Sequence, residues 1–111
     1  MQPVKLDITQ LWSRNGTLIA RLNGKLSLET VSGFLQELRP LDAEQLVLEM
    51  SGVTYLDSAG VGALVQLFVH RRGQAKKFAL AALTQQGTAV MQVSGLVKLI
   101  PTFSTAEEAF A

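Results

Sequence analysis

The chain has 111 residues, of which 48 % are hydrophobic and 17 % are charged. This length and composition predict one globular domain over residues 1–111 and exclude a disordered chain. The formal net charge of +1 gives no strong field for nucleic acid or an anionic membrane, and the absence of cysteine excludes disulfides, thiol catalysis and zinc–thiolate sites.

A β-hairpin opens the predicted fold. Apolar and polar residues alternate at the start of residues 4–12, which predicts a half-exposed strand. The Asn-Gly pair at 15–16 is the strongest short hairpin signal, because both residues tolerate a positive φ. Residues 17–22 are predicted to return as the second strand, which the Asn-Gly pair at 23–24 ends.

Helices and strands then alternate. Apolar residues at spacings of three and four predict a helix over residues 28–38, with Ser27 as its N-cap and Pro40 beyond its end. Residues 45–50 predict a buried strand. The helix after Ser58 is expected to bury five apolar side chains at spacings of three and four, those of Val61, Leu64, Val65, Phe68 and Val69. Leu28 belongs to the apolar pattern of the first helix.

The second of these helices is expected to end in a basic segment. Residues 70–72 are His-Arg-Arg, which suits a helix C-terminus, and Gly73 suits the C′ position. Arg71, Arg72 and the two lysines at 76–77 form a predicted basic patch. This patch is either a solvated face or a contact for an acidic partner.

The last third of the chain continues the alternation. Residues 77–83 predict a strand, 85–93 a short helix, and 96–103 a short strand or extended segment. Ser104 and Glu107 form a capping box that opens a final helix. A hairpin followed by alternating strands and helices predicts a single α/β domain with a mixed, mostly parallel sheet covered by helices.

The candidate site follows the strand at 45–50, where loops at the carboxyl ends of parallel strands usually carry function. Asp57 and Ser58 place a carboxylate and a hydroxyl at a helix start, and Gly60 and Gly62 leave a backbone that another surface can approach. Two interpretations stay open. In the structural one, Ser58 is the N-cap and Asp57 favours the helix dipole. In the functional one, a phosphate on Ser58 lies over free amide groups and adds close to two negative charges.

Catalysis by Ser58 is not expected. The single histidine, His70, lies twelve residues further along the chain, which is about 18 Å along a helix axis. The sequence also lacks the nucleophile elbow, the phosphate-binding loop and metal-ligand spacings. We therefore expect neither an enzyme nor a cofactor. No apolar run approaches the roughly 20 residues of a membrane helix, and a soluble cytosolic domain is expected.

Four segments together carry a resemblance to a known family. The most specific is Tyr-Leu-Asp-Ser-Ala-Gly-Val-Gly at 55–62, which follows Leu-Glu-Met-Ser at 48–51. Residues 22–26 match an L-x-G-x-L turn, Gly73 a turn before the fourth strand, and residues 93–100 a late S-G-L-x-K segment. Over nearly its whole length, the chain thus resembles STAS domains, specifically the stand-alone bacterial anti-sigma factor antagonists.

The resemblance implies partner switching. In such antagonists, the serine that matches Ser58 is phosphorylated by an anti-sigma factor that is also a serine kinase. The unmodified form binds that factor and releases sigma, and a metal-dependent phosphatase restores it. The resemblance thus implies a cytoplasmic regulator of transcription without direct nucleic-acid binding or membrane insertion, and it leaves a weak homodimer open. The expected partner-binding residues are Ser27, Thr54, Tyr55, Asp57, Ser58, Ala59, Gly60, Val61 and Gly62.

Two positions depart from the family pattern. Ser27 stands where antagonists usually carry an aspartate, and Ala59 stands where serine or threonine is commoner. Ser27 supports an alternative of another class, a non-phosphorylated accessory STAS subunit of a lipid-transport ABC complex or of a stress-signalling scaffold. Ala59 leaves Ser58 as the sole hydroxyl of the D-S-x-G stretch.

Overall fold

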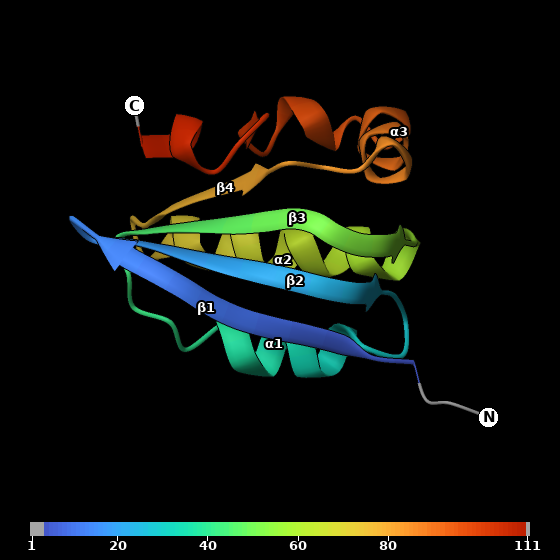
Figure 1. Ribbon diagram of the computed structural model, residues 1–111, viewed down its shortest axis with the longest axis horizontal. Helices are drawn as coiled ribbons and strands as arrows, with labels where there is room; N and C mark the ends of the chain where they lie inside the picture. Colours follow the sequence, from blue (N-terminus) through green and yellow to red (C-terminus); the bar gives the residue numbers. More distant parts are fainter. Residues whose placement is uncertain (1–3, 111) are drawn as a thin grey trace.

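Five strands form one mixed sheet in the order β1-β2-β3-β4-β5 in the computed structural model, which describes residues 4–110 (Figure 1). The first two strands pair antiparallel, and each later strand runs parallel to its predecessor. The strands are β1 (Leu6–Arg14), β2 (Thr17–Leu26), β3 (Gln45–Leu56), β4 (Lys77–Ala81) and β5 (Thr102–Phe103). This arrangement confirms the predicted α/β fold with a mixed, mostly parallel sheet.

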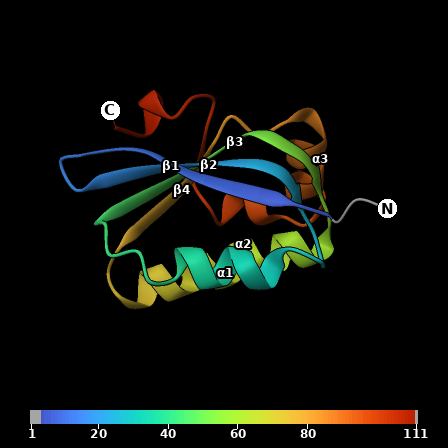
Figure 2. The same cartoon turned by 60° about the horizontal axis from the view of Figure 1, so that its bottom comes forward.

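Two helices, α1 (Val31–Leu38) and α2 (Ser58–Gly73), cover the same face of the sheet (Figure 2). The main core lies on this face, and α3 (Gln85–Val93), which has its predicted bounds, adds Met91 to it. The opposite face packs against small residues of the C-terminal segment, Ala106 and Ala109. That segment includes a short 3₁₀-helix, η2 (Glu107–Phe110). Fully buried members of the main core include Leu22, Phe34, Leu48, Leu64, Leu80 and Ile100.

The hairpin turn is confirmed, but the strands around it differ from the prediction. Asn15 and Gly16 have φ of 52° and 80°, as an Asn-Gly turn requires. β2 does not end at Gly24, because a register shift next to that glycine lets pairing with β3 continue. Gly24 has φ of 122°, which a residue with a side chain rarely adopts. β3 therefore also continues beyond residue 50, where the predicted strand ends. Its last residue is Leu56, next to the candidate site.

The buried face of α2 differs from the predicted one. Val69, which the apolar pattern placed inside, is 58 % exposed. Two small residues, Gly60 and Ala63, are buried in its place, together with Leu67. Small residues let the helix lie close to the sheet, and a pattern of hydrophobicity alone does not reveal this. The buried face of α2 therefore includes positions that carry almost no side chain.

Arg71 overturns the predicted basic patch. Its side chain is buried, with 1 % of the residue exposed, and it donates hydrogen bonds to three backbone carbonyls. The acceptors are Lys77 at 2.9 Å from Nε, Leu41 at 3.3 Å from Nη1, and Ala43 at 2.5 Å from Nη2. Arg71 thus joins the end of α2 to the start of β4 and to the loop before β3, and it is not part of a solvated cationic surface.

The C-terminal end of α2 lies two residues later than predicted. Ala75, not Gly73, has the left-handed φ of 59°. The amide of Lys76 donates to Arg71 O at 2.9 Å, and the amide of Ala75 donates to Arg72 O at 3.0 Å. These two bonds define a Schellman motif with Ala75 at the C′ position, where glycine is the usual residue.

Replacing Ala75 with glycine should raise the free energy of unfolding by about 0.5–1 kcal/mol. The left-handed conformation costs an L-residue about 1–2 kcal/mol, and glycine gives part of this back through its more flexible unfolded chain. Urea unfolding measures the change. Gly73→Ala should also stabilise, because a Cβ at Gly73 meets open space within a helix. If Gly73→Ala destabilised the protein instead, this assignment of the helix end would be wrong.

The segment after α3 differs from the prediction in its caps and helix type. Residues 96–103 form a 3₁₀-helix, η1 (Leu96–Lys98), followed by β5. The predicted final helix is a second 3₁₀-helix, η2 (Glu107–Phe110). The hydroxyl that accepts from the amide of Glu108, at 3.3 Å, belongs to Thr105 and not to Ser104.

Candidate functional site

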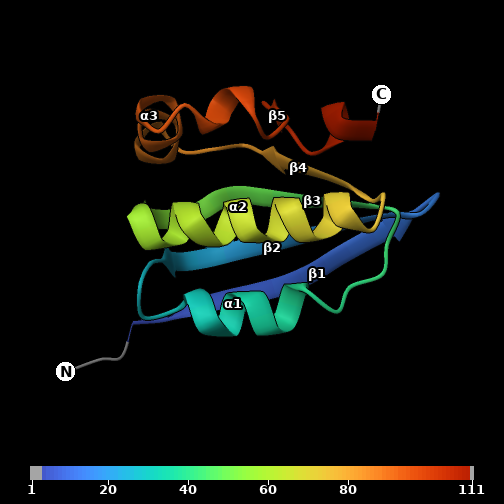
Figure 3. The same cartoon turned by 180° about the vertical axis from the view of Figure 1, so that it is seen from behind.

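The candidate site lies at the end of the sheet where β3 leads into α2. Only Asp57 separates the last residue of β3 from Ser58, the first residue of α2. The connection between β2 and α1 lies at the same end of the molecule (Figure 3). Both connections follow the carboxyl ends of parallel strands, which is where α/β sheets usually place their functional loops.

Asp57, and not Ser58, is the N-cap of α2. Its backbone is extended, with φ of −106° and ψ of −176°, and its Oδ1 accepts from the amide of Gly60 at 2.8 Å. Its Oδ2 accepts from the amide of Leu28, on the other connection, at 3.1 Å. The structural interpretation of Ser58 as the N-cap is therefore wrong, because the extended backbone that a cap needs occurs one residue earlier.

Ser58 is exposed at the first position of the helix. The third amide of the helix, that of Gly60, already bonds to Asp57. A phosphate on Ser58 would therefore compete with a carboxylate for this particular amide. An added phosphate would lie in solvent at the positive end of the helix dipole, beside a second negative charge.

The two glycines of the site have different surroundings. A Cβ at Gly60 would lie 2.2 Å from Leu26 O and 2.8 Å from Leu56 Cδ1, so this glycine lets β2 approach the helix. A Cβ at Gly62 would meet nothing within 4 Å. Of the two, Gly62 alone leaves backbone that another molecule can approach. Val61 is buried, with 8 % exposed, and Ala59 is partly exposed.

Ser27 does not cap α1, which was the prediction. The helix begins at Val31, and its N-cap position is Thr30. Ser27 is 3 % exposed, and its hydroxyl donates to Glu29 Oε2 at 2.9 Å. Its carbonyl accepts from the amides of Thr30 and Val31, at 2.9 and 3.1 Å, so a turn precedes the helix. The serine that replaces the usual aspartate is thus engaged inside this turn.

Two large apolar side chains are exposed around the site. Leu28 is 70 % exposed and Tyr55 is 46 % exposed. Thr54 is exposed as well, and its hydroxyl donates to Gly24 O at 3.3 Å. The sequence indicated Tyr55 and Thr54 but missed Leu28, because the helical spacing assigned it to a buried face. The turn before α1, which displaces Leu28 from the helix, has no signal in that spacing.

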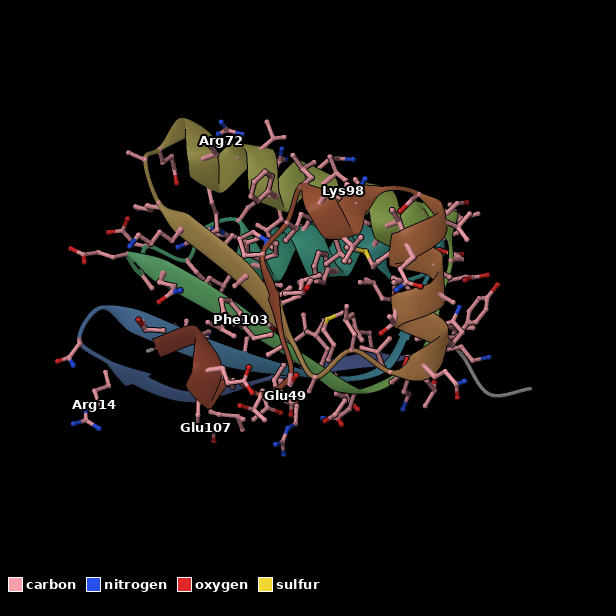
Figure 4. The ribbon with its side chains drawn as sticks, turned by 90° about the horizontal axis from the view of Figure 1, so that it is seen from above. Arg14, Glu49, Arg72, Lys98, Phe103 and Glu107 are labelled. Atoms are coloured by element: carbon pink, nitrogen blue, oxygen red, sulfur yellow. The ribbon has the colours of Figure 1, made fainter. Side chains whose placement is uncertain are left out.

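A separate cavity of about 1000 Å³ lies on the face of the sheet opposite α1 and α2, and Arg14, Glu49 and Glu107 are among its lining residues (Figure 4). Arg21 Nε donates to Glu49 Oε2 at 2.8 Å, and the amide of Ser51 donates to Glu49 Oε1 at 2.7 Å. Burial raises the pKa of Glu49, but the bonds from Ser51 and Arg21 outweigh burial and hold that pKa below its ordinary value. Glu49 and Arg21, two of the charged lining residues, are therefore paired with each other.

Within residues 4–110, no group of three or more histidine or acidic side chains could hold a metal ion. The same part of the chain has no helix that combines the length and the apolar character of a membrane span. The groups at the site are the hydroxyl of Ser58, the carboxylate of Asp57 with its two amide partners, and the exposed side chains of Leu28 and Tyr55.

Residues 9–109 match the model of the STAS domain, and the chain belongs to this family. Solved structures share its fold. An anti-sigma factor antagonist from Mycobacterium paratuberculosis is 20 % identical, with a TM-score of 0.87 over 98 % of this chain and 94 % of that one. Unphosphorylated SpoIIAA, an anti-sigma factor antagonist, is 20 % identical, with a TM-score of 0.77 over 94 % and 93 %.

The fold also occurs in a protein of another class. A sulfate transporter family protein from Wolinella succinogenes is 15 % identical, with a TM-score of 0.77 over 89 % of this chain and 85 % of that one. At these identities the structural matches establish the fold. One fold hosts many functions, so the function must be inferred from the site itself.

Proposed function

We propose that this protein is an anti-sigma factor antagonist that binds an anti-sigma factor serine kinase while Ser58 is unmodified. The observation that carries the proposal is the exposed hydroxyl of Ser58 at the start of α2, next in the chain to Asp57, whose carboxylate bonds to the amide of exposed Leu28. Tyr55, three residues before Ser58, is exposed as well. Apolar side chains around a small neutral hydroxyl form a surface that a partner can bury. The fold shared with two antagonists supports the same assignment.

Phosphorylation of Ser58 switches this surface off by charge. The phosphate adds close to two negative charges beside the carboxylate of Asp57. Hydrogen bonds from the amides of Leu28 and Gly60 already hold that carboxylate in place. Burying these charges in an interface costs desolvation and adds repulsion, and about 2–5 kcal/mol is typical for a mismatched buried charge. The helix dipole tolerates negative charge at this end, so the domain stays folded while its affinity falls.

The proposed cycle needs three proteins besides this one. The kinase binds the unmodified antagonist and in doing so releases a sigma factor. It then phosphorylates Ser58, and a metal-dependent serine phosphatase restores the hydroxyl. In this proposal the protein acts in the cytoplasm as a binding module, without catalysis, a cofactor or direct contact with nucleic acid.

Replacing Ser58 with aspartate should weaken the complex with the anti-sigma serine kinase of the same organism by about tenfold or more, which is 1.4 kcal/mol. The physical reason is the second carboxylate beside Asp57. Calorimetry in the presence of ADP measures binding without phosphoryl transfer. Ser58→Ala should retain affinity because it stays neutral, and Ser104→Asp controls for an added charge at another exposed serine. Unchanged affinity in Ser58→Asp would refute the switch.

A second candidate is an accessory STAS subunit that is never phosphorylated. The burial of Ser27, which stands in place of an aspartate, favours it, as does the fold shared with a transporter family protein. Incubation with purified anti-sigma serine kinases and Mg·ATP, followed by intact-mass analysis, separates the two. One added phosphoryl group, lost in Ser58→Ala, supports the switch. An unmodified mass supports the accessory subunit.

A further inference from the structure

The carboxylate of Asp57 serves two segments of the chain, one with each oxygen. Oδ1 accepts from the amide of Gly60 at 2.8 Å and so caps α2. Oδ2 accepts from the amide of Leu28 at 3.1 Å and so bonds to the turn before α1. The amide of Asp57 itself donates to the carbonyl of Leu26, the last residue of β2, at 3.4 Å. Helix capping needs only one of these bonds.

Another helix of this protein shows that one oxygen is enough. The hydroxyl of Thr84 caps α3 by accepting from the amide of Gly87 at 3.0 Å. The spacing matches that of α2, with a cap residue and a glycine three positions later. A hydroxyl therefore caps this kind of helix start, and the second oxygen at residue 57 has a separate role.

The second oxygen of Asp57 holds the backbone of Leu28 in place. Leu28 is 70 % exposed, so contacts with the core contribute little to its position. It lies in the turn between β2 and α1, which precedes the regular helix at Val31. The bond from its amide to Asp57 joins this turn to the residue next to Ser58. An exposed leucine that is held in place loses little conformational freedom when a partner buries it, which favours binding.

We propose that Asp57 is a positioning residue of the docking surface, which acts by holding Leu28 beside Ser58. The proposal rests on the proposed function and specifies its surface: the partner kinase has an apolar pocket for Leu28 next to the groups that meet Ser58. Leu28 supplies binding energy, and the state of Ser58 decides whether that energy can be used. Asp57 presents both to one partner as a preassembled surface.

Asp57→Thr separates the two roles, because threonine keeps one accepting oxygen and loses the other. In hydrogen exchange measured by NMR on the free protein, the amide of Leu28 should exchange about tenfold faster or more, since a charge-assisted bond is lost. The amide of Gly60 should stay protected. Thr84→Ala, which removes a cap elsewhere, should leave Leu28 unchanged. Equal exchange of Leu28 in Asp57→Thr and the natural protein would overturn the proposal.

Binding of the anti-sigma serine kinase then tests whether Asp57 acts through Leu28. Leu28→Ala and Asp57→Thr should each weaken the complex by about tenfold, and the double variant should be little weaker than either, because both changes remove one contribution. Effects that simply multiply would mean that Asp57 acts independently of Leu28, and this would overturn the proposal. If the natural protein does not bind the kinase, the proposed function fails, while the exchange measurement still decides the role of Asp57.

Discussion

Replacing Arg71 with methionine should lower the free energy of unfolding by about 3–5 kcal/mol. The substitution keeps a long side chain but leaves the carbonyls of Leu41, Ala43 and Lys77 without their donor. An unsatisfied buried polar group costs about 1–3 kcal/mol, and three carbonyls lose their donor together. Native domains have only about 5–15 kcal/mol in total. This variant should therefore be partly unfolded in mild urea.

Urea unfolding followed by far-ultraviolet circular dichroism gives the change in unfolding free energy. The neighbouring arginine provides a matched control, because Arg72 is exposed on the same helix. Arg72→Met should change stability by less than about 0.5 kcal/mol. If the two variants behaved alike, Arg71 would be a solvated side chain, as the sequence first indicated, and its contacts with the carbonyls would have no energetic weight.

Replacing Gly60 with alanine should destabilise the protein by about 3 kcal/mol or more. The new methyl carbon would lie 2.2 Å from the backbone oxygen of Leu26, and a backbone atom cannot rotate away as a side chain does. Overpacking in a tight core costs about 1–3 kcal/mol even where side chains can adjust. The start of α2 would have to move away from β2, and the amide of residue 60 would move away from Asp57 with it.

Gly62→Ala is the control for this prediction, because it makes the same chemical change two residues later in the same helix. Its methyl group meets nothing within 4 Å, so it should stabilise the helix by up to about 1 kcal/mol. Thermal unfolding should thus shift in opposite directions for the two variants. Similar shifts would show that α2 does not lie against β2 at Gly60.

Local signals were sufficient for the elements whose form depends on neighbouring residues. The Asn-Gly pair at 15–16 predicts its own turn, because the required φ values belong to those two residues. α3 has its predicted bounds, and both of its ends are local: Thr84 caps its start through the amide of Gly87, and Ser94 follows its last residue. Alternation of strands and helices then predicts the parallel sheet, because crossover connections permit few other arrangements.

The remaining features depend on contacts between distant segments. Arg71 looks like a solvated cation in the sequence, and only the fold brings three carbonyls to it. β3 continues to Leu56 because β2 continues opposite it, after the irregular pairing at Gly24. Neither effect has a local signal, since each residue involved has an ordinary neighbourhood in the chain.

The sequence predicted the strand-to-helix junction that carries the candidate site, because a helix start after a buried strand is visible in the pattern. It did not predict the local geometry of that junction. One of the two interpretations of the sequence placed the cap at Ser58, and aspartate and serine are about equally good caps. The choice depends on which residue has the extended backbone, and here that is Asp57. The place of Leu28 in the site was also missed, because its amide bonds to Asp57, which lies 29 residues away in the chain.

The two outer strands of the sheet bear on how the protein behaves in concentrated solution. Unpaired strand edges are templates for aggregation. One edge, β5, has only two residues, and the other, β1, has a register shift between Gln10 and Trp12 against its single partner. A short strand and a bulged strand offer no long, regular ladder to a second molecule. Crowding should therefore not drive copies of this chain to join edge to edge into fibrils.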